Sequence, residues 1–179
     1  GIFLLTAFFA TSYYTTYSYI EPFLKEQTGM DNSLVTASLM LFGIAGILGS
    51  VAFSRYYTRD RYAFNTCCFI VIGACIFMLL PVSGSIPVTL LLLALWGVAG
   101  TAFNIGMQSE IINIAPPEGT SVAMSIFSGI FNFGIGTGAF IGGMVCRHIG
   151  LPHIGTVGGI IAVGTLLFWL FWLQKHMKA

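Results

Sequence analysis

Six long apolar stretches follow one another along the chain, separated by short segments rich in glycine, proline and polar residues. Each stretch is close to the roughly 20 residues that an α-helix needs to cross a bilayer. The separating segments carry capping and helix-breaking residues, such as Asp31 before the second stretch and Pro116-Pro117 before the fifth. The pattern predicts six transmembrane helices, at residues 2–24, 33–54, 62–80, 87–114, 120–146 and 154–173.

The first predicted span is unusual, because hydroxyl-bearing side chains replace apolar ones in residues 11–22. Polar groups in hydrocarbon need a partner, so one face of this helix must meet other helices or a wet cavity. At about 1.5 Å of rise per residue, Tyr13 and Tyr14 lie too deep for an interfacial aromatic belt, and we expect them to line a cavity. Glu21 and Pro22, at the outer end where the proline can bend the helix, are predicted to form an extracellular gate.

The composition indicates an integral membrane protein. Of the 179 residues, 56% are hydrophobic and 7% are charged, and the mean hydropathy is +0.90, whereas about a quarter of the residues of a soluble domain are charged. The net charge of +1 and the absence of a basic cluster give no indication of a nucleic-acid partner. The four cysteines lack the spacing of a zinc site, so we expect them to pack between helices, with no metal and no cofactor.

The positive residues predict the orientation of the chain. Arg55, Arg59 and Arg61 follow the second span, and Lys175 and Lys178 follow the sixth. With alternating spans, these five of the seven positive residues lie on one side, which the positive-inside rule makes cytoplasmic. Both termini are therefore predicted to be cytoplasmic.

Aromatic and amide side chains recur at helical spacing in three of the predicted spans, and together they predict a ligand cavity. Pairs four residues apart share one face of a helix, as do Asn104 and Gln108, or Ser128 and Asn132. The predicted cavity residues are Phe9, Tyr13, Tyr14 and Tyr17 in the first span, Phe103, Asn104 and Gln108 in the fourth, and Ser128, Phe131 and Asn132 in the fifth. An interfacial belt for Tyr17 and interhelical hydrogen bonds for the amides are the alternatives.

Glycines form two stripes that let helix backbones approach closely. They are Gly43, Gly46 and Gly49 in the second span, and Gly134, Gly138 and Gly142 in the fifth. The sequence leaves open whether these stripes pack inside the six-helix bundle or against a partner outside this chain.

Enzymatic functions are not supported by the sequence. His148, His153 and His176 fall in loops or at the end of the chain, and no paired carboxylates share a helix face at depth. The sequence has no Asn-Pro motifs, which an aquaporin-like channel needs, and no carbonyl filter sequence like those of potassium channels. The remaining alternative to a transporter is a stand-alone six-helix channel or scaffold that dimerises through its glycine stripes.

Three segments carry a family resemblance: residues 17–23, residues 42–49, and residues 128–136 together with Gly142-Gly143. They resemble the second half, spans seven to twelve, of a major facilitator superfamily transporter, and within it the bacterial sugar efflux transporters of the drug:proton antiporter branch. The apolar run that starts directly at Gly1 agrees with a piece of a longer protein.

The resemblance implies an all-α membrane protein, in which residues 1–179 form a C-terminal six-helix domain with an inverted three-plus-three repeat. It implies that the first and fourth spans line the cavity, while the second and fifth face an N-terminal half and give the glycine stripes their partner there. The implied function is proton-coupled efflux of a sugar or drug-like molecule across the bacterial inner membrane, by alternating access.

The chain departs from the family pattern in the loop after the second span. Gly49 of the loop motif is present, but its acidic position is Phe53, although Arg55 and Arg59 keep the positive charge. A charge-relay gate at this loop is therefore not expected. None of the six spans has an ionisable residue near its middle, so the group that binds the coupling proton is expected in the other half.

Overall fold

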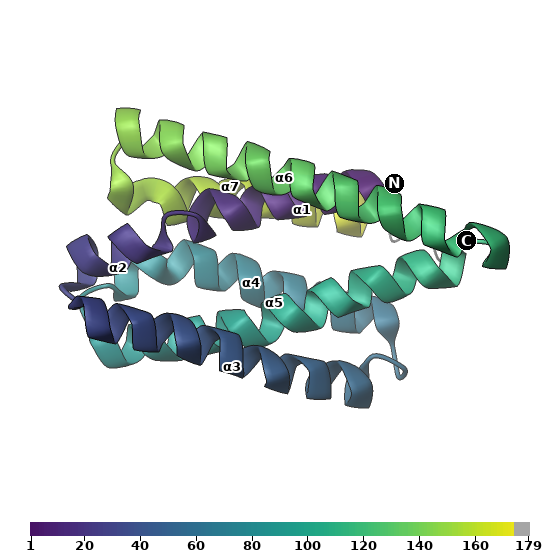
Figure 1. The fold of residues 1–179 in the computed structure, drawn as a ribbon, viewed down its shortest axis with the longest axis horizontal. Helices are drawn as coiled ribbons and strands as arrows, with labels where there is room; N and C mark the ends of the chain where they lie inside the picture. The colour runs from purple at the N-terminus through teal and green to yellow at the C-terminus, as the bar shows by residue number, and fades with distance from the viewer. Residues whose placement is uncertain (174–179) are drawn as a thin grey trace.

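A computed structural model describes residues 1–173, which form helices joined by short connections (Figure 1). The α-helices are α1 (Ile2–Tyr17), α2 (Ile20–Thr28), α3 (Asn32–Tyr56), α4 (Arg61–Val82), α5 (Ile86–Ile114), α6 (Thr120–His148) and α7 (Ile154–Phe168). Short 3-10 turns, η1 (Pro117–Gly119) and η2 (Leu151–His153), precede α6 and α7, and a π-helical turn, η3 (Trp169–Leu173), follows α7. The five segments Asn32–Tyr56, Arg61–Val82, Ile86–Ile114, Pro117–His148 and Leu151–Phe171 are long and apolar enough to cross a membrane. The fold is that of an all-α membrane protein.

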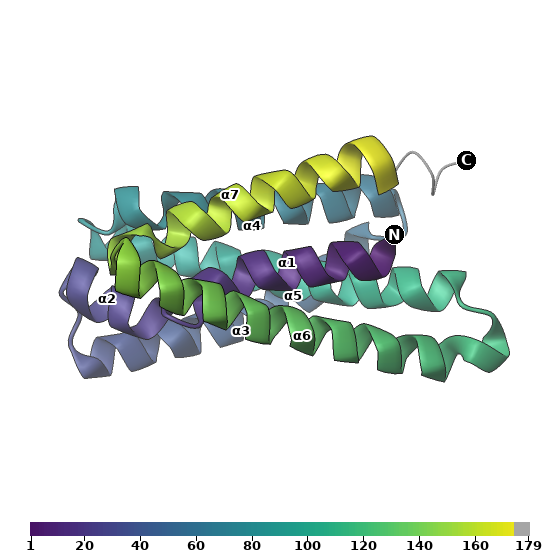
Figure 2. The same cartoon turned by 90° about the horizontal axis from the view of Figure 1, so that it is seen from above.

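The packing of the helices follows an internal twofold relation. α1 lies along α6 and α7, whereas α5 lies along α3 and α4, and α4 also contacts α7. Exchanging α1 with α5, α6 with α3 and α7 with α4 turns each of the four largest interfaces of α1 and α5 into another of similar extent. α1 and α5 run in opposite directions (Figure 2). This arrangement agrees with the predicted inverted three-plus-three repeat.

The predicted first span is not one continuous helix. It divides at Ser18 and Tyr19 into α1 and α2. Pro22 has no N–H to donate to the carbonyl of Ser18, four residues earlier, and its ring conflicts with that carbonyl in a regular helix. The break therefore lies one turn before the proline. Tyr19 occupies the break, with its ring against Gly142 and Gly143 of α6 and its hydroxyl donating to the carbonyl of Ala139 at 3.1 Å.

Most of the small hydroxyl groups of α1 are bonded to main-chain carbonyls. Thr11 and Thr15 donate to carbonyls of their own helix, four residues earlier. Ser12 and Thr16 donate to α7, to the carbonyls of Gly158 at 2.8 Å and Ile154 at 3.1 Å. These residues are buried, so much of the polarity of α1 serves to join it to α7.

Five of the six predicted packing glycines lie at contacts inside the bundle. A Cβ atom on Gly134, Gly138 or Gly142 would meet the main chain or small side chains of α1, and at Gly142 also the ring of Tyr19. One on Gly46 or Gly49 would meet α5. The expectation that these stripes find their partner in another half is therefore wrong for these five positions, because α1 and α5 already occupy the space that the glycines leave. Gly43 differs: it is exposed, and a Cβ atom added there would have no other atom within 4 Å.

The N-terminus, the α3–α4 and α5–α6 connections and the end of α7 lie at one end of the bundle (Figure 2). Arg55, Arg59 and Arg61 are therefore at that end. Lys175, Lys178 and His176, on which the predicted orientation and the exclusion of enzymes also drew, lie outside the described residues.

Replacing Gly138 by alanine is expected to destabilise the protein. The new Cβ would lie 2.6 Å from the carbonyl oxygen of Thr11 and 2.9 Å from the nitrogen of Thr15, so α6 must move away from α1. Overpacking of this kind costs about 1–3 kcal/mol, measurable by thermal unfolding of the full-length protein in detergent. Gly164→Ala is the matched control: it lies inside α7 with no atom within 4 Å and should gain up to about 1 kcal/mol from helix propensity. Equal effects of the two changes would contradict close packing of α6 on α1 at Gly138.

Candidate functional site

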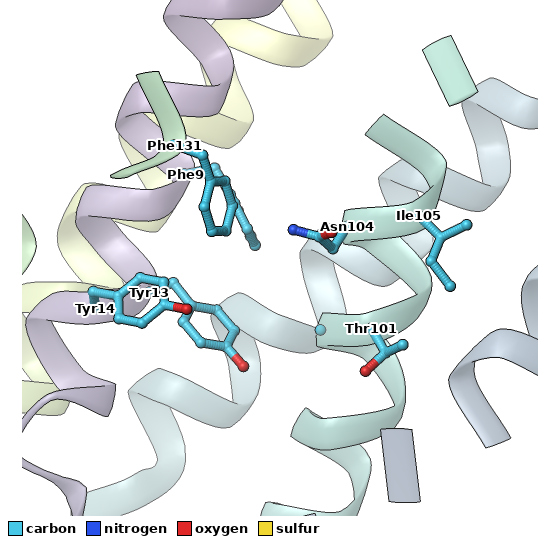
Figure 3. A pocket seen from close by; sticks show the side chains of 8 residues that line it. Phe9, Tyr13, Tyr14, Thr101, Asn104, Ile105 and Phe131 are labelled. Carbon is cyan, nitrogen blue, oxygen red and sulfur yellow. The ribbon is translucent and has the colours of Figure 1, made fainter. Parts of the chain in front are cut away.

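A cavity of about 220 Å³ lies between α1 and α5 and is bordered by one residue of α6 (Figure 3). Five predicted cavity residues are among those that line it. The lining residues are Phe9, Tyr13 and Tyr14 from α1, Gly100, Thr101, Asn104 and Ile105 from α5, and Phe131 from α6. Figure 3 shows the aromatic side chains of α1 and α6 on one side of the cavity and Thr101 and Asn104 on the other.

Aromatic rings from both repeats meet behind the cavity and hold α1 against α5. The ring centroids of Phe9 and Phe103 are 4.4 Å apart, and those of Tyr13 and Trp96 are 5.2 Å apart. Phe103 and Trp96 are almost completely buried. Contacts of this type are worth about 0.5–1.5 kcal/mol each beyond the area that they bury, so the wall of the cavity is firmly placed.

The two tyrosine hydroxyls at this cavity, those of Tyr13 and Tyr14, have no hydrogen-bond partner among the described residues. The Tyr13 hydroxyl can reach its position because residue 100 is a glycine. A Cβ there would lie only 2.9 Å from that oxygen. These phenols, unlike the small hydroxyls of α1, remain available to a bound molecule, as donors and as acceptors.

Asn104 adds an amide to the same space. Its Oδ1 accepts a hydrogen bond from Nε2 of Gln108, one turn further along α5. This bond fixes the amide so that its nitrogen, with two N–H groups, points into the cavity (Figure 3). The site therefore combines aromatic surfaces with free hydroxyl and amide groups, and no Asp, Glu, Lys, Arg or His is among its lining residues.

A second buried polar group lies toward the end of α5 that bears the arginines. Glu110 is fully buried; its Oε1 accepts a 2.8 Å hydrogen bond from the Tyr57 hydroxyl, and its Oε2 lies 3.6 Å from Nη1 of Arg61. Burial and then the hydrogen bond to Glu110 raise the pKa of the Tyr57 hydroxyl well above its usual range, so it remains a donor at neutral pH. The cluster joins the α3–α4 connection to α5.

Comparison with known proteins places these features in a family. The sequence model of the Major Facilitator Superfamily matches residues 2–179. The chain belongs to the Major Facilitator Superfamily. It is also 37% identical, over 99% of its own length, to a protein named probable sugar efflux transporter from Pasteurella multocida (strain Pm70), of which it covers 44%. The chain thus spans less than half the length of this relative. Family membership confirms the predicted family, the half-fold and the assignment to transporters rather than to enzymes.

The charge of one arginine beside the α3–α4 connection is compensated from a different part of the chain. Arg61, which is 40% exposed, pairs with the carboxylate of Glu110 from a different helix. The sequence alone places Glu110 near the end of its span and gives no connection with Arg61. No local signal could make this connection, because the two residues are far apart in the sequence and meet only through the packing of α4 on α5.

The structure does not bring all ten predicted cavity residues to the cavity wall. Phe103 supports Phe9 from behind, Gln108 holds Asn104, and Tyr17 packs on Phe42 and Trp96. Ser128 and Asn132 are on an exposed face of α6, where Nδ2 of Asn132 donates to the carbonyl of Ser128. They share a helix with Phe131 but point in another direction.

Four residues of the site were missed by sequence reasoning: Gly100, Thr101, Ile105 and Trp96. Gly100 and Trp96 are separated by one turn, and Asn104 follows one turn later, so a face containing Asn104 predicts both. This spacing alone does not indicate a binding site, because glycine and tryptophan also occur in ordinary helix packing.

The two predicted gate residues lie in α2, beyond the break. Glu21 forms an exposed 2.7 Å ion pair with Lys25 of the same helix. α2 is anchored by Ile20, Phe23 and Leu24, which are buried. No group of three or more metal-ligating side chains comes together in the described part of the chain.

Glu110→Ala is expected to lower stability by about 1–3 kcal/mol, because the buried hydroxyl of Tyr57 loses its acceptor. Glu110→Gln keeps an acceptor oxygen and should cost less. Thermal unfolding of the full-length protein provides the measurement, and Glu118→Gln, an exposed carboxylate in η1, is the control. Equal unfolding temperatures of Glu110→Ala and Glu118→Gln would show that the cluster does not stabilise the fold.

Proposed function

We propose that this chain is the C-terminal half of a secondary transporter that exports sugars or related small polar molecules, and that the cavity between α1 and α5 is its part of the substrate site. The observation that carries the proposal is the set of free Tyr13, Tyr14 and Asn104 groups beside aromatic walls. Sugars combine hydroxyls, which need donors and acceptors, with C–H faces that pack on aromatic rings. The name of the Pasteurella multocida relative is in agreement with this chemistry.

The size of the cavity supports a site shared with a second domain. Ligand pockets usually have about 300–1,000 Å³, whereas this one has about 220 Å³ and is bounded by one bundle only. A substrate of sugar size would therefore need an opposing wall. In the proposed transporter, the N-terminal half supplies that wall, and the two halves rock about the site in alternating access.

α6 has an exposed face suited to that second half. Ser121, Ser125, Ser128, Asn132 and Gly136 follow one another along it, all exposed. A different exposed face of α6 carries large apolar side chains, Val122, Ile126, Phe133 and Phe140, as expected for contact with lipid. Small and polar residues are costly against lipid, so the first face is the one that we assign to the N-terminal half. On α3, the exposed Gly43 and Thr36 have the corresponding character.

The direction and energy source follow from the same proposal. From the arginines at one end of the bundle we infer that this end, and both termini, are cytoplasmic in a bacterial inner membrane. Export by proton antiport requires a titrating group, and the cavity lining in this half contains no carboxylate. We therefore assign the coupling proton to the other half. The rival channel or scaffold would need its glycine stripes for dimerisation, but five of those glycines are already in contact with α1 or α5.

Tyr13→Phe and Tyr14→Phe are expected to raise the KM for exported sugar about 2- to 10-fold each, the equivalent of one lost hydrogen bond of about 0.5–1.5 kcal/mol. Radiolabelled sugar efflux from cells that carry the full-length protein gives the KM. The control is Thr165→Val, which also removes one hydroxyl, but one bonded inside α7 to the carbonyl of Ile161. An unchanged KM in both tyrosine variants would contradict the site assignment. Absence of sugar export by the full-length protein would contradict the proposed function.

Pro22→Ala tests the gate that Glu21 and Pro22 are proposed to form. An N–H at position 22 can bond the carbonyl of Ser18 and favours a continuous helix by about 1 kcal/mol. We expect about fivefold slower export with unchanged substrate affinity, as measured by efflux rates and by equilibrium binding. Pro87→Ala is the control, since Pro87 lies in the first turn of α5, where no hydrogen bond is missing. Equal rates in the wild type and Pro22→Ala would exclude a moving hinge at this position.

A further inference from the structure

Two arginines, one in the last turn of α3 and one in the α3–α4 connection, lie against one tyrosine ring. The guanidinium carbon of Arg55 lies 5.9 Å from the ring centroid of Tyr56, and that of Arg59 lies 5.8 Å from it. All three residues are exposed. Within residues 1–173, neither guanidinium contacts a carboxylate, so both N–H forks remain available.

The neighbouring charges leave this corner positive. The charge of Arg61 is compensated by Glu110. The carboxylate of Asp60 caps α4 by accepting from the nitrogens of Tyr62 and Ala63. Arg55 and Arg59 against Asp60 leave one net positive charge on the surface, beside an aromatic ring of the kind that anchors membrane proteins at the headgroup level.

The same face of α3 carries apolar side chains below the arginines. Ile44, Leu48 and Val51 precede Arg55 by eleven, seven and four residues, which places them on one face of the helix. They are 59%, 62% and 58% exposed. The 25 residues of α3 have a length of about 37 Å, somewhat more than a hydrocarbon core of about 30 Å. Arg55, in the last turn, therefore lies at the level of lipid headgroups.

From this geometry we infer that Arg55, Tyr56 and Arg59 form a binding site for the phosphate of one monoanionic phospholipid. The guanidinium groups bind the phosphate oxygens, and an acyl chain lies along Ile44, Leu48 and Val51. A lipid is favoured over a soluble phosphate because the positive corner continues directly into this apolar stripe. The single net charge favours one anionic headgroup. The inference is independent of the substrate cavity, which lies between other helices.

Native mass spectrometry of the full-length protein in detergent, titrated with phosphatidylglycerol, tests the site. We expect one preferentially bound phosphatidylglycerol and much weaker phosphatidylcholine. Arg55→Gln with Arg59→Gln should weaken phosphatidylglycerol binding about 30-fold, since each basic residue near the headgroups contributes roughly fivefold. Arg147→Gln is the matched control, an exposed arginine at the end of α6, at the opposite end of the bundle from the α3–α4 connection.

Three further outcomes decide the inference. Leu48→Asn should weaken phosphatidylglycerol binding while leaving the arginines intact, and sn-glycerol 3-phosphate at the same concentration should not bind. Phosphatidylglycerol binding that is unchanged in the double arginine variant, or reduced equally by Arg147→Gln, would overturn the site. Tight binding of glycerol 3-phosphate would overturn the assignment to a lipid. Matching thermal unfolding of the variants and the wild type ensures that folding is not the cause.

Discussion

Polar groups inside a bilayer have no water to bond, so each must find a partner in the protein or in a ligand. In α1, this constraint separates two kinds of hydroxyl. The serines and threonines bond main-chain carbonyls of α1 and α7 and fix the helix in place. The phenols of Tyr13 and Tyr14 have no such partner among the described residues and border a cavity. The structural and the available polar groups thus lie on different faces of one helix.

Close backbone contact determines where that cavity can be. Glycines of α6 allow α1 to pack closely on it, and glycines of α3 allow the same for α5. α1 therefore lies against α6 and α7, and α5 lies against α3 and α4. The two central helices then meet through large aromatic side chains instead of through backbones, as Phe9 and Phe103 do. Space remains between them where residue 100 is a glycine and Tyr13 can extend across it. The cavity is a consequence of small residues at one set of interfaces and large residues at another.

The arginines at one end of the bundle also divide into a paired one and two exposed ones. Glu110 is buried and takes Arg61 as its partner, which ties the α3–α4 connection to α5. Breaking one side of a buried pair is costly, so this contact belongs to the architecture. Arg55 and Arg59 remain outside, against the exposed ring of Tyr56. One connection therefore contributes both to internal packing and to the outer surface.

The sequence by itself predicted an all-α membrane protein, its family and the approximate limits of five membrane segments. It also singled out Tyr13, Tyr14 and Asn104, which the structure brings to one cavity. It could do so because apolar length and isolated polar groups in hydrocarbon have strong local signatures. Only the tertiary structure decided that the first segment breaks at Tyr19, that Ser128 and Asn132 turn away from the cavity, and that the glycines pack against α1 and α5. It also decided that Glu110 meets Arg61. These outcomes depend on which face of each helix meets which neighbour, and helical periodicity in one sequence gives the faces but not their partners.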